Sequence, residues 1–372
     1  MRHRYDDRYN GGRSVAHRSA ADAVGYVEQE WRRSGSCPAG TVPIRRLPKI
    51  DGMSAPRAMP SLSRDQGGRN NVVLDDADAA RDEFAAALAL DGPYHGASAL
   101  LPSWKPSNIE AGDSSITNLV IGGTVNRTWV AHPFPGELPP DITNQIAVGL
   151  MASPSAFGDD NPNLYVYYTV CNPNFIIVCI SNYDRYDYQG LCMQNDGGAS
   201  HRCVNLGCPG FVQTSNEIAL GMSFINGGSS VTYDNVPYVA VNIHRPSGQE
   251  QWWVSVNDTP IGYFPHTLFP TFFPESFVHQ LGGSVHDSRP GGAHTDTAMG
   301  NGRAPDGGGG GGAAMVKAYM AVDADGADVK DMPVKDVVTA PKCYNARVLG
   351  ENRDVPGYDV AYGGPGGSGC DK

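Results

Sequence analysis

Short runs of β-branched and aromatic residues recur along most of this chain, and several alternate between apolar and polar positions. Gly, Pro and Asn clusters separate these runs. The clearest runs are Thr117–Ile121, Leu164–Val170, Tyr238–Ile243 and Trp252–Val256. A period of two is the pattern of strands, and strands at this spacing with turn residues between them favour a sandwich or barrel over a parallel α/β sheet. We therefore predict an all-β fold, an antiparallel β-sandwich.

Composition supports that fold and suggests how the chain is divided. The 46 glycines and 28 prolines favour many turns, and 372 residues favour one large domain with a small accessory region. Residues 1–36 are polar and Arg-rich, so we predict a disordered basic N-terminus. Residues 37–92 form a separate small region, in which the alanine-rich stretch Asp76–Leu90 predicts one helix or turn. The strand signals begin near Pro93, so we assign 93–372 to the sandwich.

Charge and cysteine content exclude some partners and indicate a compartment. The net charge of −11 argues against nucleic acid, which needs a cationic surface. No apolar run reaches membrane-spanning length, so no membrane partner is expected. Eight cysteines, several beside turn residues, favour an oxidised, secreted protein. The charged start Met1–Arg8 lacks the apolar stretch of a signal peptide, which we attribute to a sequence that starts too late rather than to a lost export signal.

Cys203 and Cys208 lie in a Gly/Pro-rich run that ends in Phe-Val-Gln. Their spacing suits a disulfide loop or half of a zinc site, but no Cys/His pair follows at zinc-finger spacing. The spacing of His286 and His294 fits no established ligand pattern either. We therefore favour disulfides and expect neither a metal nor another cofactor.

Several other segments accompany this cysteine pair in a fixed order. They are Gly40–Arg46, Tyr94–Ala99, Trp104–Pro106, Trp252–Trp253, Gly262–Pro265, Gly282–Gly283, His294–Gly300, Cys343–Asn345 and Tyr362–Gly366. The series resembles the plant neprosin family, secreted glutamic peptidases that cut after proline, from about Cys37 to Cys370. The resemblance implies a sandwich of two antiparallel sheets and an activation peptide within 37–92 that contains Gly40–Arg46.

The resemblance also implies two disulfide pairs, Cys203 with Cys208 and Cys343 with Cys370. Four further cysteines are left without an implied partner. They are Cys37, Cys171, Cys179 and Cys192.

The family's two catalytic glutamates are both replaced. One lies in an Asn-x-Ile-Glu-Ala-Gly-Trp segment, which here is Asn144–Leu150 and has Ala147 at the glutamate position. The other follows Trp-Gly-Gly, which here is Leu281–Gly283 with Ser284 next. A methyl group can neither accept a proton nor stabilise an oxyanion, and a serine hydroxyl is too weak a base to act alone. A serine mechanism, with a nearby histidine as the base, ranks below simple loss of activity.

Two other carboxylates and three aromatic side chains are candidates for the remaining chemistry. Glu110 lies in an Ile-Glu-Ala-Gly string and Glu217 follows the cysteine segment, so they are the fallback catalytic residues, although a strand or loop glutamate is the commoner case. Trp252, Trp253 and Tyr263 are candidates for a substrate cleft. Adjacent strand residues point to opposite faces, so one tryptophan belongs to the core and the other can stack on proline.

We therefore expect a degenerate peptidase that binds a peptide or a proline-rich protein without cutting it. The alternative is an active acid prolyl endopeptidase that uses carboxylates outside this alignment. A third possibility is a relic without a stable function. Asn126 lies in a glycosylation sequon, which matters only in the secretory pathway.

Overall fold

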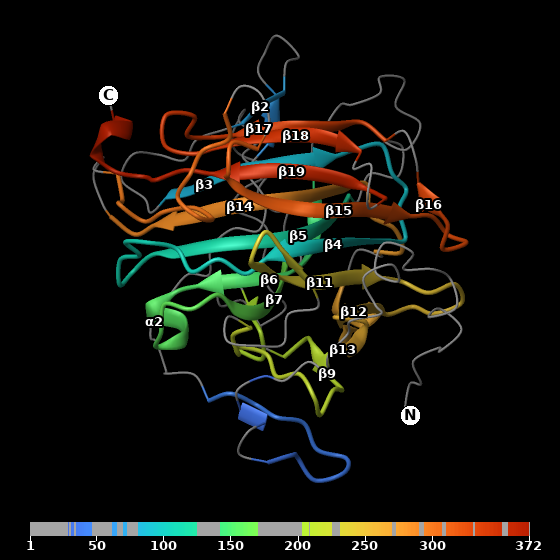
Figure 1. The fold of residues 1–372 in the computed structure, drawn as a ribbon. Coiled ribbons are helices and arrows are strands. Elements are labelled where there is room, and N and C mark those ends of the chain that lie inside the picture. Colours follow the sequence, from blue (N-terminus) through green and yellow to red (C-terminus); the bar gives the residue numbers. More distant parts are fainter. Residues whose placement is uncertain are drawn as a thin grey trace, which may run out of the picture.

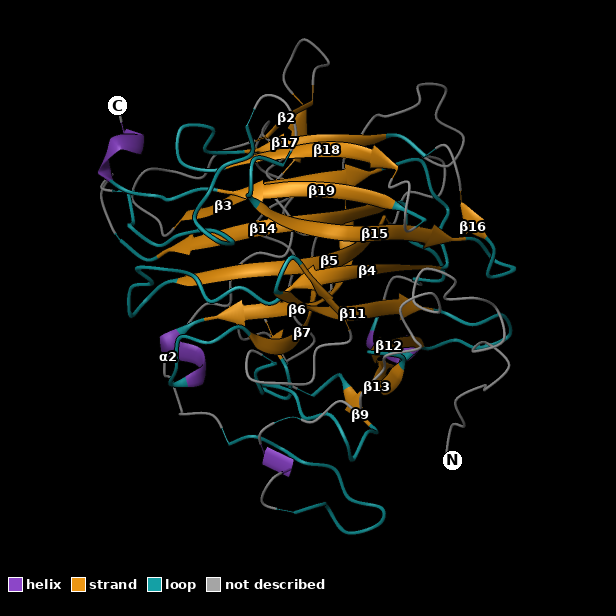
Figure 2. Ribbon diagram, viewed as in Figure 1, coloured by secondary structure: helices purple, strands orange, loops and turns teal. Residues whose placement is uncertain are grey.

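Strands make up nearly all the regular structure of this protein (Figures 1 and 2). The computed structural model describes residues 29, 31–32, 35–46, 62–64, 70–72, 81–124, 142–169, 203–207, 209–224, 231–269, 273–289, 294–306, 310–329, 332–351 and 356–371. Two antiparallel sheets pack face to face in this part of the chain, which confirms the all-β sandwich. The four predicted strands are also confirmed, each within one or two residues or inside a longer strand.

The smaller sheet has seven strands in the order β17-β3-β14-β5-β6-β7-β8. Their bounds are Val334–Val338 (β17), Arg81–Ala89 (β3), Val278–Asp287 (β14), Ser114–Thr124 (β5), Ile142–Ala152 (β6), Asn163–Thr169 (β7) and Cys203–Val204 (β8).

The larger sheet has ten strands. Its main path runs β18-β19-β15-β4-β11-β12-β13-β9, while β10 pairs with β11 and β16 with β15. The bounds are Asn345–Glu351 (β18), Tyr358–Gly363 (β19), Ala314–Val322 (β15), Gly96–Pro102 (β4), Val236–His244 (β11), Trp252–Val256 (β12), Thr259–Phe264 (β13), Val212–Gln213 (β9), Val231–Tyr233 (β10) and Asp328–Val329 (β16).

The main core lies between the sheets, and alternation along each strand decides which side chains enter it. On β6, Ile146 and Val148 point into this inter-sheet core, where they meet residues of the ten-stranded sheet such as Val254. The intervening Ala147 belongs to a second apolar cluster, on the outer face of the seven-stranded sheet. A third, smaller cluster that includes Tyr238 covers part of the outer face of the ten-stranded sheet. The molecule therefore has one shared core and two distinct outer faces.

The helix or turn expected within Asp76–Leu90 is wrong, because Arg81–Ala89 is strand β3. This strand pairs with β14 on one side and β17 on the other. Its alanines are fully buried, and one of them, Ala86, lies against Gly282 on β14 so closely that a Cβ on the glycine would be 2.6 Å from the Ala86 Cα atom. Small side chains suit a strand covered on both faces, and that tertiary context overrides the helical preference of alanine. Residues 81–89 thus belong to the sandwich, before the boundary expected at Pro93.

A few short elements complete the described structure. They are β1 (Leu62–Arg64) paired with β2 (Asn70–Val72), helix α2 (Pro154–Phe157) and the 3₁₀ turns η6 (His266–Leu268) and η7 (Ser368–Asp371). Within the described residues, no helix has the length and apolar character that crossing a membrane requires. A disulfide joins Cys343, just before β18, to Cys370 in η7, as the resemblance implied.

Candidate functional site

Ala147 and Ser284 lie on the same outer face of the seven-stranded sheet. Ala147 on β6 is opposite Val120 of β5, and Ser284 on β14 is opposite Ile116 of the same strand. Val120 and Ile116 share the outer face, because both belong to its apolar cluster. The two positions are thus two strands and four residues apart, which on a flat sheet is roughly 17 Å between Cα atoms. Long side chains leaning toward each other across β5 would be needed for the two positions to act together.

Asn118 lies midway between these positions. On β5 it is opposite Gly149 of β6 and Gly282 of β14, so it is centred on the line that joins Ala147 to Ser284. Its side chain is fully buried, and its Nδ2 donates to the Tyr165 hydroxyl at 2.9 Å. Burial raises the pKa of Tyr165, which keeps this hydroxyl protonated. The hydroxyl accepts the amide N–H and retains its own proton to donate.

The glycine beside Asn118 on β6 is required by close packing. A Cβ on Gly149 would lie 2.3 Å from the Thr117 carbonyl oxygen and 2.7 Å from the Asn118 Cβ atom. Such distances leave no room for any side chain. Gly149 therefore keeps Asn118 in place between Ala147 and Ser284.

The Asn118 Oδ1 acceptor and the Ser284 hydroxyl are among the buried polar atoms of this face that have no hydrogen-bond partner within the described part of the chain. An unsatisfied buried polar group costs about 1–3 kcal/mol, so such atoms favour a site that a polar ligand or water can complete. They are the strongest local sign that this face keeps a binding role.

In the described strands of this sheet, the carboxylate on the same face is that of Asp82 on β3. Register places Asp82 opposite His286 of β14, and its Oδ1 atom lies 2.7 Å from the His286 Nδ1 atom. No bond joins Ser284 to His286, although both point to this face. His279 points the other way, into the core, where its ring nitrogens contact the Ser276 and Tyr319 hydroxyls. Burial lowers its pKa to about 3. Because His279 points away from Ser284 and His286 is bonded to Asp82, neither histidine is placed as the base of a serine nucleophile.

The fallback residue Glu110 lies outside this face, in the loop between β4 and β5. Its carboxylate pairs with Arg289, and the Nε–Oε2 bond is 3.0 Å long. The hydrogen bond from Arg289 is the largest effect on Glu110 and holds its pKa below the usual value. A carboxylate held ionised in this way is a structural anchor and a poor general acid. The other fallback, Glu217, is exposed and its backbone N–H donates to Ser215 Oγ in a turn.

The segment His294–Gly300 builds a buried polar network around Asp113. Thr297 donates its hydroxyl to Asp113 Oδ2 at 2.7 Å, Thr295 donates to the same atom, and Ser288 donates to Oδ1. Burial opposes ionisation of Asp113, but these donors outweigh it and lower its pKa. The network fixes the loop that follows β14. Part of this family motif is therefore structural.

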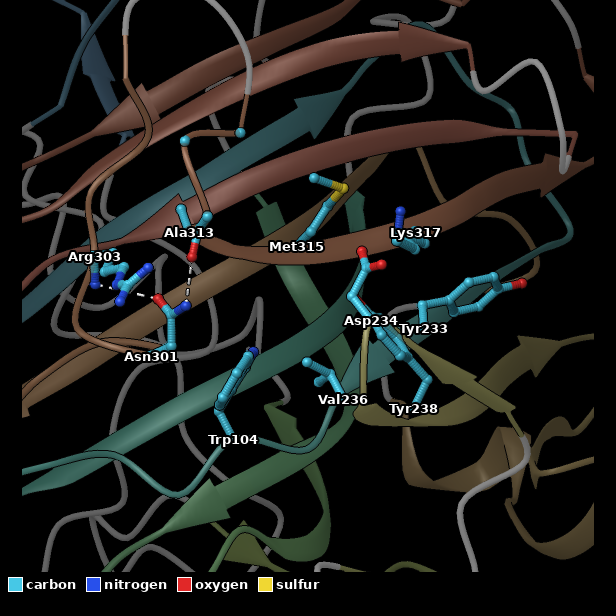
Figure 3. A pocket seen from close by; sticks show the side chains of 13 residues that line it. Trp104, Tyr233, Asp234, Val236, Tyr238, Asn301, Arg303, Ala313, Met315 and Lys317 are labelled. Carbon is cyan, nitrogen blue, oxygen red and sulfur yellow. Dashed lines mark hydrogen bonds between the residues drawn. The ribbon is translucent and has the colours of Figure 1, made fainter.

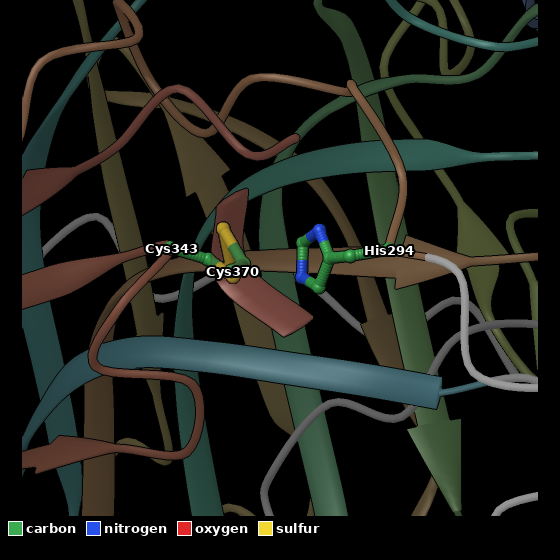
Figure 4. A group of neighbouring side chains, drawn as sticks. All are labelled: His294, Cys343 and Cys370. Atoms are coloured by element: carbon green, nitrogen blue, oxygen red, sulfur yellow. A yellow bond between two sulfur atoms is a disulfide. The ribbon is translucent and has the colours of Figure 1, made fainter. Parts of the chain in front are cut away.

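His294 lies beside the Cys343–Cys370 disulfide, and the three residues have the composition of a metal site (Figure 4). The cysteine sulfurs are bonded to each other. The His294 nitrogens are also engaged, Nδ1 with the Thr295 carbonyl at 2.9 Å and Nε2 with the Glu83 carboxylate. Burial disfavours the charged ring, but Glu83 outweighs that effect and raises the pKa of His294. An imidazolium with both N–H groups donated has no lone pair for a metal.

The proposed cleft aromatics lie on the other sheet. Trp252 is fully buried in the inter-sheet core, and its indole N–H donates to the Phe273 carbonyl at 2.8 Å, so it cannot line a cleft. Trp253 is also buried, and its ring lies 4.9 Å from that of Tyr263. These residues come from β12 and β13 of the ten-stranded sheet, so the structure does not bring them together with Ala147 and Ser284.

A half-open pocket of about 520 Å³ lies on the outer face of the ten-stranded sheet (Figure 3). Trp104, Tyr233 and Tyr238 line it together with Arg303 and Lys317. Sequence analysis missed this site because its residues come from a loop after β4, the β10–β11 hairpin and the glycine-rich segment before β15. The pair Trp104-Lys105 was noted as a family motif, but nothing local indicates what faces it.

The N-terminal motif Gly40–Arg46 docks at the β7 end of the seven-stranded sheet (Figure 1). Arg45 is the anchor: it donates to Asn163 Oδ1 at 3.1 Å, the Phe157 carbonyl at 2.6 Å and Asp159 Oδ2 at 2.8 Å. Burial opposes ionisation of Asp159, but the hydrogen bonds from Arg45 and Asn163 outweigh it and lower its pKa. The sequence suggested a solvated strand end or a processing site for these arginines, and the structure gives Arg45 a docking role.

Several predictions lie outside the described residues, including most of the N-terminus at 1–36 and two predicted modifications. The Cys203–Cys208 disulfide is one, because Cys208 is not described and only the backbone of Cys203 is. The glycosylation sequon at Asn126 is the other.

Comparison with known proteins identifies the family. The family model for neprosin matches residues 124–365, more than half of the chain. This chain belongs to the neprosin family. Among solved structures it is similar to a crystal structure of Scytalido-glutamic peptidase with a peptide-based transition state analogue, at 9% identity and a TM-score of 0.32, covering 77% of this chain and 100% of that one. That likeness is too remote to support conclusions about chemistry. The disulfide and the family both fit an extracellular protein.

Proposed function

We propose that this member of the neprosin family is a secreted, plant-type peptide-binding protein that has lost peptidase activity. The observation that supports the proposal is that Ala147 and Ser284, the positions that the family resemblance assigns to the glutamates, share one sheet face and supply no carboxylate there. Peptide hydrolysis by this route needs one group to take a proton from water and another to stabilise the oxyanion. On the described strands, the remaining carboxylate of that face, Asp82, is bonded to His286.

The groups that remain suit binding of an amide. The Asn118 Oδ1 atom accepts and the Ser284 hydroxyl donates or accepts, while the Tyr165 hydroxyl retains a proton to donate. A peptide backbone offers one N–H donor and one carbonyl acceptor per residue, so it can satisfy these atoms without any proton transfer. The proposed partner is therefore a peptide or a proline-rich protein, bound on the outer face of the seven-stranded sheet after the chain that buries Asn118 and Ser284 in this structure is displaced.

We further propose that the segment around Arg45 acts as the activation peptide does in the family. Support comes from its position: it docks on Phe157, a member of the apolar cluster of that face, and on Asn163 of β7. A docked segment at this sheet edge can restrict access to the proposed site until it is released.

The decisive experiment measures hydrolysis of a proline-containing quenched peptide from about pH 2.5 to 7, the range in which carboxylates titrate. The acid-treated full chain should show no cleavage while remaining folded by circular dichroism and should still bind the uncleaved peptide. Cleavage after proline would overturn the proposal and make the acid endopeptidase the better description, with Glu110→Gln and Glu217→Gln as the next variants.

Placing glutamates at positions 147 and 284 gives a second test of the same proposal. Ala147→Glu with Ser284→Glu should raise hydrolysis above either single variant, because a positioned general base contributes about 10²–10⁴-fold and needs the second group as well. Equal rates for the double and single variants would show that this face is not the ancestral catalytic site. The matched control Ala147→Gln with Ser284→Gln has similar side-chain size and no carboxylate.

A further inference from the structure

The pocket on the ten-stranded sheet has an aromatic floor. Trp104 lies along one side, while Tyr233 and Tyr238 pack edge to face with ring centroids 5.3 Å apart (Figure 3). The indole N–H of Trp104 points toward the pocket and has no hydrogen-bond partner in the described part of the chain. An indole ring of this kind offers an apolar surface for packing and a hydrogen-bond donor at the same place.

Cationic side chains stand at both ends of this floor. Arg303 is exposed, lies over Gly312 and pairs with no described carboxylate. Lys317 lies 5.5 Å above the Tyr233 ring and 3.4 Å from Asp359 Oδ2. Asp234 also lines the pocket and Lys317 is paired with Asp359, so Arg303 is the lining cation left to pair with an acidic group of a ligand. The free guanidinium is shaped for a carboxylate, which it can bind through two parallel hydrogen bonds.

The type of surface favours a sugar over a peptide. Met315 and Lys317 on β15 and Val236 and Tyr238 on β11 present side chains, because the main chain of these strands is already paired within the sheet. An extended peptide is usually held through main-chain bonds at a sheet edge, which in the described sheet only the three-residue strand β10, ending at Tyr233, offers beside this pocket. Side chains alone can recognise a pyranose ring. Its C–H face packs on an aromatic ring, and its hydroxyls exchange hydrogen bonds with groups such as the exposed Asp234.

We propose that this pocket binds an acidic oligosaccharide, a short chain of uronic acid units. Sugar rings pack on Trp104 and the tyrosines, and a carboxylate of the ligand pairs with Arg303. The volume of about 520 Å³ is typical of small-molecule sites, which span roughly 300–1,000 Å³. This site is independent of the proposed peptide site, because the two lie on the outer faces of different sheets.

The test is a calorimetric titration of the full chain with trigalacturonate at low and high salt. Wild type should bind it, more weakly as salt rises, and should bind its methyl ester and neutral maltotriose at least about tenfold more weakly, since neither offers a carboxylate for charge-assisted hydrogen bonds with Arg303. Arg303→Gln should lose a similar factor. Trp104→Phe, which keeps an apolar ring without the N–H, should also bind more weakly.

Lys342→Gln is the matched control, because it removes an exposed cation that does not line the pocket and should bind as wild type does. The Ala147→Glu and Ser284→Glu double variant should also bind trigalacturonate normally, so failure at one site is distinguishable from failure at the other. No binding by wild type at millimolar trigalacturonate, or unchanged binding by Arg303→Gln, would reject the proposal. Equal affinity for triglutamate would reject it too and assign the pocket to acidic peptides.

Discussion

The outer faces of the two sheets are built from opposite kinds of surface. On the seven-stranded sheet, strands such as β3 and β7 are buried along nearly their whole described length, so both of their faces are covered. On the ten-stranded sheet, β11 and β15 contain both buried and partly exposed residues and leave a half-open aromatic pocket. The contrast indicates that the covered face bears more of the stability and that the open face is freer to change its ligand.

Breaking the Glu83–His294 pair, which links the two sheets, should cause the largest loss in the free energy of unfolding. Glu83 of β3 pairs with His294, whose loop continues to Met299 beside Gly364 at the end of β19. Leaving one partner of a buried pair alone costs roughly 3–5 kcal/mol, so we expect a loss of that order for His294→Gln in urea unfolding at pH 5.

The same pair predicts a pH dependence. Burial alone would lower the pKa of His294, but Glu83 raises it, so the folded pKa lies above the unfolded value. The stabilisation is then complete below about pH 6.5, the ordinary value for histidine, and is lost as pH rises through the folded pKa. The stability gap between wild type and His294→Gln should narrow above pH 6.5. A gap that widens there would contradict the assigned charge.

A matched pair of truncations compares the faces directly. Leu88→Ala on the outer face of β3 should cost about 2–5 kcal/mol, because Leu88 is fully buried in the apolar cluster of that face. Met315→Ala on the outer face of β15 should cost less than about 1 kcal/mol, because Met315 is partly exposed at the pocket. Chemical denaturation of both variants tests the contrast, and equal losses would refute it.

The edge of the ten-stranded sheet is held by a covalent bond. The Cys343–Cys370 disulfide spans 27 residues that include β18 and β19. Replacing both cysteines with alanine should destabilise the fold by roughly 2–4 kcal/mol, mainly by freeing the unfolded chain. Amide exchange should accelerate most in β18 and β19. An unchanged melting temperature would show that packing alone holds this edge.

The smallest change in the free energy of unfolding is expected when Ser284 is substituted. Its buried hydroxyl has no partner among the described residues, so Ser284→Ala removes a desolvated group and should change the free energy of unfolding by no more than about 1 kcal/mol, in the stabilising direction. Thermal unfolding of the variant without ligand measures this. A clear loss of stability would show that the hydroxyl is bonded and would weaken the case for a ligand site.

Sequence patterns predicted the fold where local and tertiary preferences agree. The runs at Leu164–Val170 and Trp252–Val256 are β-branched or aromatic, and both lie in strands. The pattern failed at Arg81–Ala89, because alanine favours helix locally and only the neighbouring strands make it suitable here.

The candidate site was predicted only in part. Family motifs placed Ala147 and Ser284, but Asn118 has no motif of its own, and its central position follows from the register of three strands. The pocket was not predictable for the same reason: Trp104, Tyr233 and Arg303 are far apart in the sequence, and only the topology brings them together.

The position of β3 limits how this protein can be matured by proteolysis. A cut after Ala89 that released the preceding chain would remove the strand between β14 and β17. The sheet would then be divided, and β14 would expose a long, apolar, unpaired edge, which promotes aggregation. Any productive processing that discards the N-terminal segment must therefore fall before Arg81, and such a cut would still release the segment that docks through Arg45.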